Sequence, residues 1–161
     1  MRSVLRVLAA EEDLVLGGVA TVARSDPDRL FLTYGDEGGP RFTYGEFDAR
    51  CRRFANGLAA HGLGHGDRVS VFTAGALTAA QAMFGLWRGG LVYAPVNYNL
   101  VGEALRYQLA DTDPAAVVCD AGLLPALLEV ADALRPDCLL VLDAPEEFER
   151  ARLRRGRRPV V

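Results

Sequence analysis

Four short apolar segments, separated by stretches of helical periodicity, constrain the fold more than any other feature of this sequence. They span residues 68–73, 91–96, 115–119 and 139–142. Their apolar residues are mostly consecutive rather than alternating with polar ones, which is typical of strands covered by protein on both faces. Because these strands alternate with helices, we predict a doubly wound α/β fold, with a mostly parallel sheet flanked by helices.

Two shorter strands and a helix are predicted before this region. Residues 30–34 form a candidate strand, and a Gly- and Pro-rich turn joins them to residues 41–43, which can complete a hairpin. Thr43 and Glu46 have the spacing of a capping box and predict the start of a helix. One apolar stripe runs along that helix, formed by Phe47, Cys51, Phe54, Ala55 and Leu58. Gly62 marks its expected end.

Three further helices are predicted, at about 78–88, 102–110 and 123–134. The first of them has Thr78 and Gln81 at capping-box spacing, and the pair Gly89-Gly90 ends it. The second carries apolar residues on one side, at Val101, Leu105 and Leu109.

Composition excludes several classes of protein. The chain has 161 residues, of which 50% are hydrophobic and 24% charged. These values suit one ordinary domain with a buried core and exclude wholesale disorder. The formal net charge of −3 argues against nucleic-acid binding by the chain as a whole. All 18 basic residues are Arg, so mechanisms that need a Lys on phosphate or a Schiff-base amine are excluded. The absence of both Lys and Ile indicates a GC-rich bacterial genome.

Charge divides the chain into two segments. Residues 1–149 contain 12 Arg and 21 acidic residues, whereas residues 150–161 contain six Arg and no acid. We expect an α/β body over 1–149 and an Arg-rich tail over 150–161 that is disordered, or the aberrant product of a truncation or a reading-frame shift. Binding of nucleic acid or anionic lipid by the tail, or a solvated helix end, are the alternatives.

The cysteines and the hydropathy pattern indicate the compartment. Cys51, Cys119 and Cys138 are far apart and form no C-x-x-C pair, so we predict free, buried thiols rather than a disulfide or a zinc site. The N-terminal segment lacks the apolar core of a signal peptide, and no apolar stretch reaches the ~18 residues of a membrane span. We therefore expect a cytoplasmic protein with no membrane span.

The sequence has candidate binding residues but no complete catalytic set. The glycines of residues 62–67 follow a helix and precede a strand, the reverse of a dinucleotide-binding fingerprint, and are interpreted as a turn. His61 and His65 are interpreted as exposed loop residues, because no third metal ligand lies nearby. Scattered carboxylates lie near helix and strand ends, at Asp111, Asp113 and Asp120. We assign no residue as catalytic, cofactor-binding or metal-binding.

One loop lies where a ligand would be expected. Residues 73–78 connect a strand to a helix, at the edge where open α/β sheets bind ligands. Backbone N–H groups at the start of that helix could take a phosphate. The loop has no Lys and matches no phosphate-binding pattern, so a plain connection is the favoured interpretation and nucleotide binding is the alternative.

The order of four motifs resembles a known family. Residues 41–47, RFTYGEF, resemble the "(L/F)-T-Y-x-E-(L/F)" motif of AMP-forming acyl-CoA synthetases and related adenylating ligases. Residues 62–69 are similar to that family's "G-(L/V)-x-x-G-D-x-V", and residues 84–97 to its "lgilkaGavyvPlN". Residues 103–111 resemble "E-l-x-y-x-l-x-d". The resemblance extends over about residues 19–143.

This resemblance implies a fold, a reaction and its cofactors. Family members activate a carboxylic acid with ATP and Mg²⁺ as an acyl-adenylate, and the thiol of CoA then displaces AMP. The chain departs from the family pattern at Ala74–Leu77 and at Tyr98–Asn99, and it has no Ser/Thr/Gly-rich phosphate loop ending in Pro-Lys after the strand at 139–142. The motif residues that are present look structural, so no catalytic residue is carried over.

We therefore expect the incomplete N-terminal part of an adenylate-forming ligase. Alone, it should be inactive, and ATP, Mg²⁺ and CoA should bind it poorly. Exposed apolar faces would favour self-association. Two alternatives are a free-standing α/β binding or interaction module without catalysis, and a nucleotide-binding domain that uses the loop at 73–78.

Overall fold

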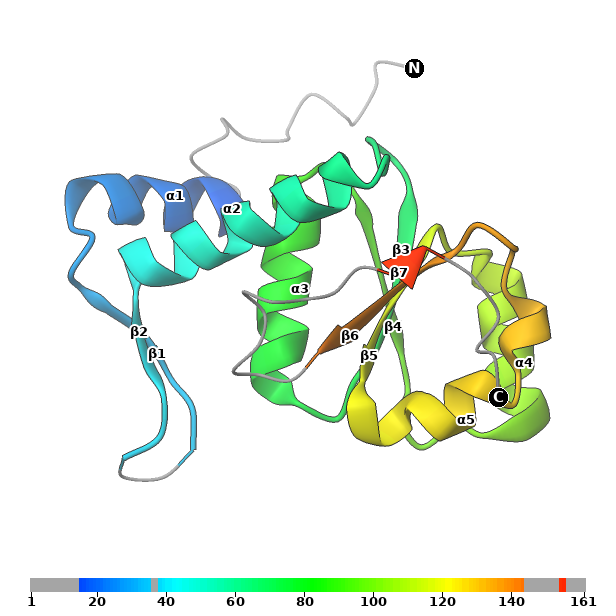
Figure 1. The fold of residues 1–161 in the computed structure, drawn as a ribbon. Coiled ribbons are helices and arrows are strands. Elements are labelled where there is room, and N and C mark those ends of the chain that lie inside the picture. The colour runs from blue at the N-terminus through cyan, green and yellow to red at the C-terminus, as the bar shows by residue number, and fades with distance from the viewer. Residues whose placement is uncertain (1–14, 36–37, 144–153, 156–161) are drawn as a thin grey trace, which may run out of the picture. The chain divides into compact units, whose positions relative to one another are not determined.

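The computed structural model describes residues 15–35, 38–143 and 154–155. The chain divides into two compact units, with the boundary between Cys51 and Arg52. Each unit is described by itself (Figure 1).

The described residues of the first unit form one helix, a hairpin and the beginning of a second helix. Its elements are α1 (Val15–Ser25), β1 (Leu30–Thr33), β2 (Arg41–Thr43) and the first part of α2 (Tyr44–Ala60). β1 and β2 pair antiparallel, with Leu32 opposite Phe42, so the predicted hairpin is confirmed. No sequence pattern pointed to α1, because Gly17 and Gly18 lower the helix propensity of its first turn.

The predicted capping box begins α2. The Thr43 N–H donates to Glu46 Oε2 at 2.9 Å, and the Glu46 N–H donates to Thr43 Oγ1 at 3.2 Å. Each side chain thus satisfies a backbone donor that the first turn of a helix leaves free. Phe31 of β1 contacts the rings of Tyr44 and Phe47, with centroid distances of 4.6 and 4.9 Å. The first family-like motif therefore joins the hairpin to α2.

The second unit is built on a five-stranded sheet with the order β4–β3–β5–β6–β7. Its strands are β3 (Arg68–Phe72), β4 (Val92–Val96), β5 (Ala116–Asp120), β6 (Leu139–Asp143) and β7 (Arg154–Arg155). The first four are parallel and only β7 is antiparallel, which confirms the mostly parallel sheet. Pro95 lies in β4, which is an edge strand, the place in a sheet where Pro is tolerated.

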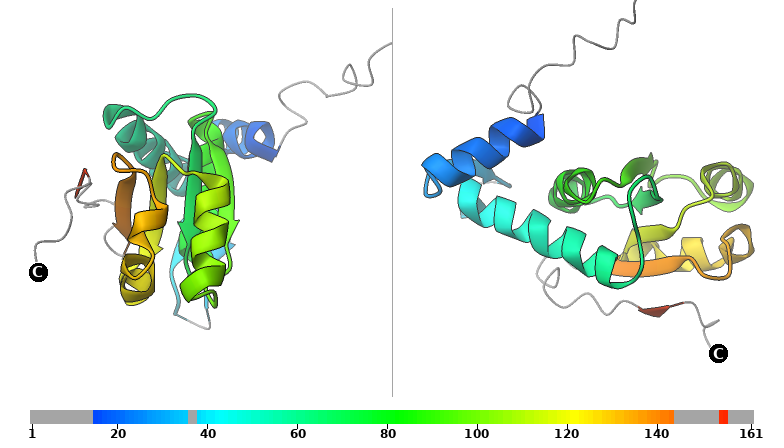
Figure 2. Two further views of the ribbon diagram at one scale, coloured as in Figure 1. Left: turned by 90° about the vertical axis from the view of Figure 1, so that its right-hand side faces the viewer. Right: turned by 90° about the horizontal axis from the view of Figure 1, so that it is seen from above.

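Helices cover both faces of this sheet, as predicted (Figures 1 and 2). On one face, Phe54 and Leu58 of α2 and Leu86 of α3 (Ala76–Arg88) pack against residues of β3, β5 and β6. On the other face, Leu105 and Leu109 of α4 (Gly102–Thr112) pack with Phe72 and with α5 (Leu124–Leu128). Strand β5 is buried from Ala116 to Cys119, which explains its continuous apolar sequence.

Three details of the predicted helices were wrong. α3 begins at Ala76 with Gly75 as N-cap and no side-chain cap bond, so Thr78 and Gln81 form no capping box but lie buried inside the helix. α4 continues past the predicted end at residue 110 to Thr112. Val101 is its N-cap and is 63% exposed, so Val101 does not join the buried stripe of Leu105 and Leu109.

The predicted helix over 123–134 is broken into short pieces. The 3₁₀ turn η3 (Ala121–Leu123), helix α5 and the 3₁₀ turn η4 (Ala131–Ala133) replace it. The break falls at Val130, whose backbone (φ −120°, ψ 19°) leaves the helical region while its side chain is 2% exposed and packs with Leu127. Burial of Val130 in the core therefore overrides the local helical pattern.

Most of the Arg-rich tail at 150–161 lies outside the described residues. Arg154–Arg155 form β7, which pairs with Leu139 and Leu140 of β6. The prediction for the tail otherwise stays a prediction. Among the helices that the structure describes, none is both long enough and apolar enough to cross a membrane.

Candidate functional site

The direction of the chain connections in the second unit marks one candidate site. From β3 the chain runs through α3 to β4 on one side, whereas β5 continues through α5 to β6 on the other. In open α/β sheets of this kind, ligands bind outside the carboxyl ends of the two strands at which the direction reverses. Here those ends are Thr73, which follows β3, and Asp120, the last residue of β5.

At this point a carboxylate of the protein occupies the donors of the β3–α3 loop. The Thr73 hydroxyl donates to Asp120 Oδ1 at 2.6 Å, and the Ala74 N–H donates to Asp120 Oδ2 at 2.8 Å. The Gly75 N–H donates to Thr73 Oγ1 at 2.9 Å. The carboxylate thus lies before the first turn of α3, where the helix dipole favours a negative charge.

These bonds to Asp120 are relevant to the alternative in which the loop at residues 73–78 binds a nucleotide. A phosphate bound by the loop in front of α3 would use the Ala74 N–H and the Thr73 hydroxyl. The donor of Ala74 and the hydroxyl of Thr73 already bind Asp120. The geometry therefore favours the interpretation of residues 73–78 as a plain connection.

Sequence reasoning did not connect Asp120 with this loop. It grouped Asp120 with Asp111 and Asp113, but the structure separates the three. Asp111 is exposed on α4. Asp113 caps α4 with a left-handed backbone (φ 43°), and its carboxylate lies 3.3 Å from Arg68 Nη2 and 3.8 Å from Arg135 Nε. The missed signal was positional, because Asp120 directly follows a predicted strand that pairs with β3.

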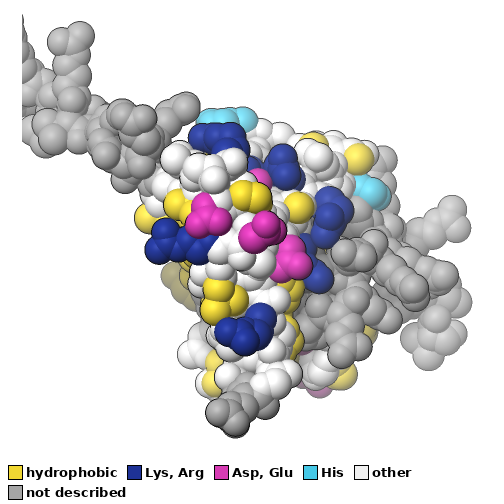
Figure 3. Space-filling view, turned by 90° about the vertical axis from the view of Figure 1, so that its left-hand side faces the viewer, with side chains coloured by type: hydrophobic (Ala, Val, Ile, Leu, Met, Phe, Trp, Pro, Cys, Tyr) yellow, Lys and Arg dark blue, Asp and Glu magenta, His cyan; other side chains and the backbone are white. Residues whose placement is uncertain are grey.

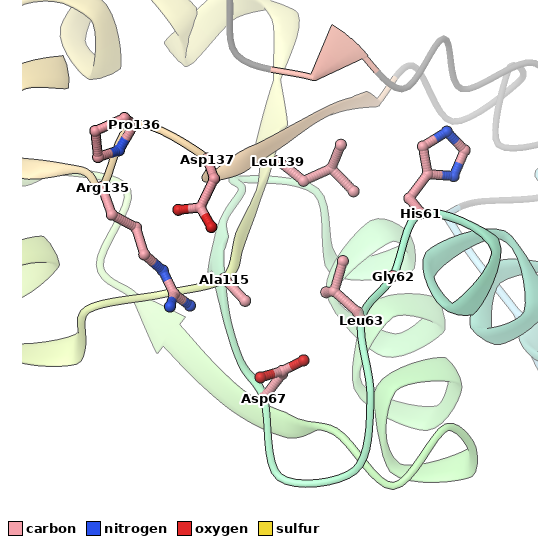
Figure 4. Close-up of a pocket in the computed structure, with 9 residues that line it drawn as sticks. All are labelled: His61, Gly62, Leu63, Asp67, Ala115, Arg135, Pro136, Asp137 and Leu139. Atoms are coloured by element: carbon pink, nitrogen blue, oxygen red, sulfur yellow. The ribbon is translucent and has the colours of Figure 1, made fainter.

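The opposite edge of the sheet is hollowed (Figure 4). A cavity of about 580 Å³ lies at the amino ends of β3, β5 and β6, lined by His61, Gly62, Leu63, Asp67, Ala115, Arg135, Pro136, Asp137 and Leu139. Arg135 is partly engaged, since its Nε donates to the Pro114 carbonyl at 3.0 Å. The lining thus offers two carboxylates against one guanidinium, a balance that does not favour phosphate or a carboxylic acid.

The glycine-rich segment beside this cavity forms the predicted turn. α2 ends at Ala60, and Gly62 (φ 89°) and Gly66 (φ 86°) adopt positive φ, which suits residues without a Cβ. The Gly66 N–H donates to the Gly90 carbonyl at 2.9 Å, so this turn is fastened to the end of α3. The prediction of an exposed His61 was wrong: this residue is partly buried just after α2, with its Nδ1 2.8 Å from the Gly57 carbonyl oxygen, whereas His65 is exposed as predicted.

The three cysteine thiols, at Cys51, Cys119 and Cys138, are free and buried, as predicted. Burial raises the pKa of Cys119 to about 12 and that of Cys138 to about 11. Within the described part of the chain, no three His, Cys, Asp or Glu side chains are grouped so that they could hold a metal ion.

Among the described residues that are visible in Figure 3, acidic, basic and hydrophobic side chains are interspersed. This distribution is that of an ordinary solvated protein surface.

Known proteins that are similar in sequence to this chain include a peptide synthase and a fatty-acid–CoA ligase. A synthase of N-(5-amino-5-carboxypentanoyl)-L-cysteinyl-D-valine from Streptomyces clavuligerus is 30% identical over 125 residues, which are 76% of this chain and 15% of that protein. A medium/long-chain fatty-acid–CoA ligase of Mycobacterium tuberculosis is 31% identical over 102 residues, 63% of this chain and 17% of the ligase. The chain thus spans about a sixth of the length of these curated relatives.

Solved structures share the fold. A fatty acyl-CoA synthetase of Mycobacterium tuberculosis superposes with a TM-score of 0.73 at 20% identity, over 95% of this chain and 31% of that one. A benzoate CoA ligase of Burkholderia xenovorans gives a TM-score of 0.69 at 23% identity, over 89% of this chain and 30% of that one. At these identities the likeness concerns the fold.

The family model of the AMP-binding enzymes matches residues 19–159, nearly the whole chain. It includes the four motifs that the structure places at the α2 cap, the turn before β3, the end of α3 with β4, and α4. The chain therefore belongs to the AMP-binding enzyme family, which includes acyl-CoA synthetases and other adenylate-forming ligases.

Proposed function

We propose that this chain is the N-terminal scaffold of an ATP-dependent, AMP-forming acid–thiol ligase of the fatty-acid type. The family match over residues 19–159 is the observation that carries the proposal. In the reaction proposed for the full-length protein, a substrate carboxylate oxygen attacks the α-phosphorus of ATP and pyrophosphate leaves. The sulfur of CoA then attacks the acyl carbon, and AMP leaves.

The roles of the family-like residues support a scaffold. Thr43 and Glu46 cap α2, Gly66 and Gly90 form turns with positive φ, and Pro95 lies in an edge strand. Each of these roles shapes the backbone and none requires a substrate. We accordingly propose that this chain alone does not catalyse either step, and that it does not bind ATP, Mg²⁺ or CoA strongly.

The first experiment measures AMP release by the purified chain. The chain is mixed with ATP, Mg²⁺, CoA and a panel of fatty, aromatic and amino acids, and AMP is quantified by chromatography against a protein-free blank. We expect no AMP above the blank, whereas a full-length family member assayed in parallel should produce it. Acid-dependent AMP formation by this chain would contradict the proposed inactivity.

A second experiment tests the ligase assignment itself. Residues 19–143 of this chain replace the matching segment of the Mycobacterium tuberculosis medium/long-chain fatty-acid–CoA ligase, to which the chain is 31% identical. We expect the folded chimera to retain acyl-CoA formation, because the grafted residues supply the same scaffold. A chimera that is soluble and cooperatively folded, binds ATP, and yet forms no acyl-adenylate would contradict the assignment.

We also propose a cytoplasmic location and weak self-association. Trp87 and Val92 are 39% and 45% exposed at the end of α3 and on edge strand β4, and such apolar surface favours association. Sedimentation velocity over a hundredfold range of concentration should show a rising average mass. A constant monomer mass would contradict the association.

A further inference from the structure

We infer that Asp120 acts as an internal anion at the switch point of the sheet, and that its carboxylate holds the β3–α3 loop by occupying the donors that an external phosphate or carboxylate would use. This inference concerns the folded chain alone and does not depend on the proposed ligase activity. Asp120 is in this sense a positioning residue for the loop at residues 73–75.

Strand register brings the two partners together. Phe72 of β3 pairs with Cys119 of β5, so the next residues, Thr73 and Asp120, are neighbours across the sheet. Phe72 and Cys119 both pack on the α4 side. Because side chains alternate along a strand, Thr73 and Asp120 are directed to the other face, on which α3 begins. The contact is therefore a consequence of topology, which explains why no sequence motif reveals it.

The hydrogen-bond pattern is that of a bound anion. Each carboxylate oxygen of Asp120 accepts from a different group, the Thr73 hydroxyl and the Ala74 N–H. The Thr73 hydroxyl also accepts from the Gly75 N–H, so one charge organises three consecutive residues of the loop. Hydrogen bonds to an ionised carboxylate are shorter and stronger than neutral ones.

Burial of Thr73 strengthens the bond of its hydroxyl to Asp120, whereas Ala74 is exposed. Thr73 is 9% exposed, so water competes little for its hydroxyl. Gly75 is the N-cap of α3 and has no side chain with which to accept from the first turn. A negative charge supplied from β5 therefore compensates for the positive end of the α3 dipole.

Chemical rescue tests this inference. In Asp120→Gly, the carboxylate is removed and space is left for a small anion. We expect Tm to fall by about 5 °C or more. Sodium formate should restore part of the loss in a saturable manner, and should shift the amide resonances of Ala74 and Gly75. Sodium chloride at equal ionic strength should do neither, and inorganic phosphate serves as a larger probe of the same donors.

Two comparisons make the test specific. In the unsubstituted chain, formate should leave the Ala74 and Gly75 amides unshifted, because Asp120 occupies their position. Asp111→Gly removes an exposed carboxylate from α4 and should lose stability without rescue by formate. If Asp120→Gly is folded but formate acts no differently from chloride, or if the unsubstituted chain shows the same amide shifts, the inference is overturned.

A second substitution covers the case in which Asp120→Gly does not fold. Asp120→Asn keeps the size of the side chain and removes its charge. We expect amide hydrogen exchange at Ala74 to accelerate about tenfold, because a neutral acceptor holds this N–H less strongly. Unchanged exchange at Ala74 in Asp120→Asn would overturn the inference as well.

Discussion

Two adjacent glycines at the end of α3 allow a test of whether a positive φ makes glycine necessary at a turn. Gly89 has ordinary helical dihedral angles (φ −81°, ψ 0°), whereas Gly90 has φ +70°. Both lie in the segment that resembles the ligase family, and the Gly90 carbonyl accepts from the Gly66 N–H. We predict that Gly90→Ala destabilises the protein and that Gly89→Ala does not.

The magnitude follows from the local geometry. A Cβ at a left-handed position costs roughly 1–2 kcal/mol, and only Gly90 pays this cost. A new Cβ at Gly89 would meet Leu91 Cδ1 at 3.4 Å, which is an ordinary contact. At Gly90 it would meet His65 Cδ2 at 2.8 Å, but His65 is exposed and can rotate away. Both substitutions lower the conformational entropy of the unfolded chain equally, which stabilises each variant by about 0.4–1 kcal/mol. The free energy of unfolding should therefore be about 1–2 kcal/mol lower for Gly90→Ala than for Gly89→Ala.

Urea unfolding followed by fluorescence of Trp87, the single tryptophan of the chain, measures this difference. Equal m-values are required for the comparison of midpoints. The combination of His65→Ala with Gly90→Ala separates the two causes, since it removes the side-chain contact and keeps the strained φ. Equal stability of Gly89→Ala and Gly90→Ala would refute the reasoning, and full recovery in the double variant would assign the loss to the His65 contact instead.

Three further predictions concern buried and charged groups. Among the described residues the buried Ser70 hydroxyl has no hydrogen-bond partner. Ser70→Ala should therefore keep or raise the free energy of unfolding, by up to about 1 kcal/mol, in urea melts, and a clear loss would reveal a bond that the structure does not show. Burial raises the pKa of Cys119 to about 12 and of Cys138 to about 11. Thiols of the unfolded chain ionise near about pH 8.5. The stabilisation that the two buried, protonated thiols give is therefore complete below that pH and is lost as the pH rises toward their pKa values in the folded protein. Between about pH 9 and 11, the free energy of unfolding should fall less steeply with pH in Cys119→Ala/Cys138→Ala than in the unsubstituted protein. An equally steep fall would contradict burial of the two thiols as its cause. Arg106 donates to Asp132 and lowers the pKa of that carboxyl. This pair stabilises the fold above the unfolded pKa of about 4 and is lost as the pH falls below it. Arg106→Met should raise the Asp132 pKa toward its ordinary value in an NMR titration, and no rise would exclude the ion pair in solution.

Local signals in the sequence predicted much of the fold. The consecutive apolar residues of 115–119 predicted a strand that is buried on both faces, and the spacing of Thr43 and Glu46 predicted the start of α2. These features are local, because a covered strand needs apolar side chains throughout and a capping box uses residues three apart. The predicted cap at Thr78 was wrong because capping-box spacing can also occur in the interior of a helix. Thr78 lies buried inside α3 and not at its start.

The sequence by itself determined the family, the alternation of strands and helices, and the glycine-rich turns at residues 62–67 and 89–90. Only the tertiary structure decided what lies at the edge of the sheet where ligands are expected. Thr73 and Asp120 are 47 residues apart, and only the parallel register of β3 and β5 joins them at 2.6 Å. Packing likewise decided the break at Val130, where burial in the core outweighs helical propensity. Periodicity and capping act within a few residues, whereas strand pairing and core packing join residues that the sequence places far apart.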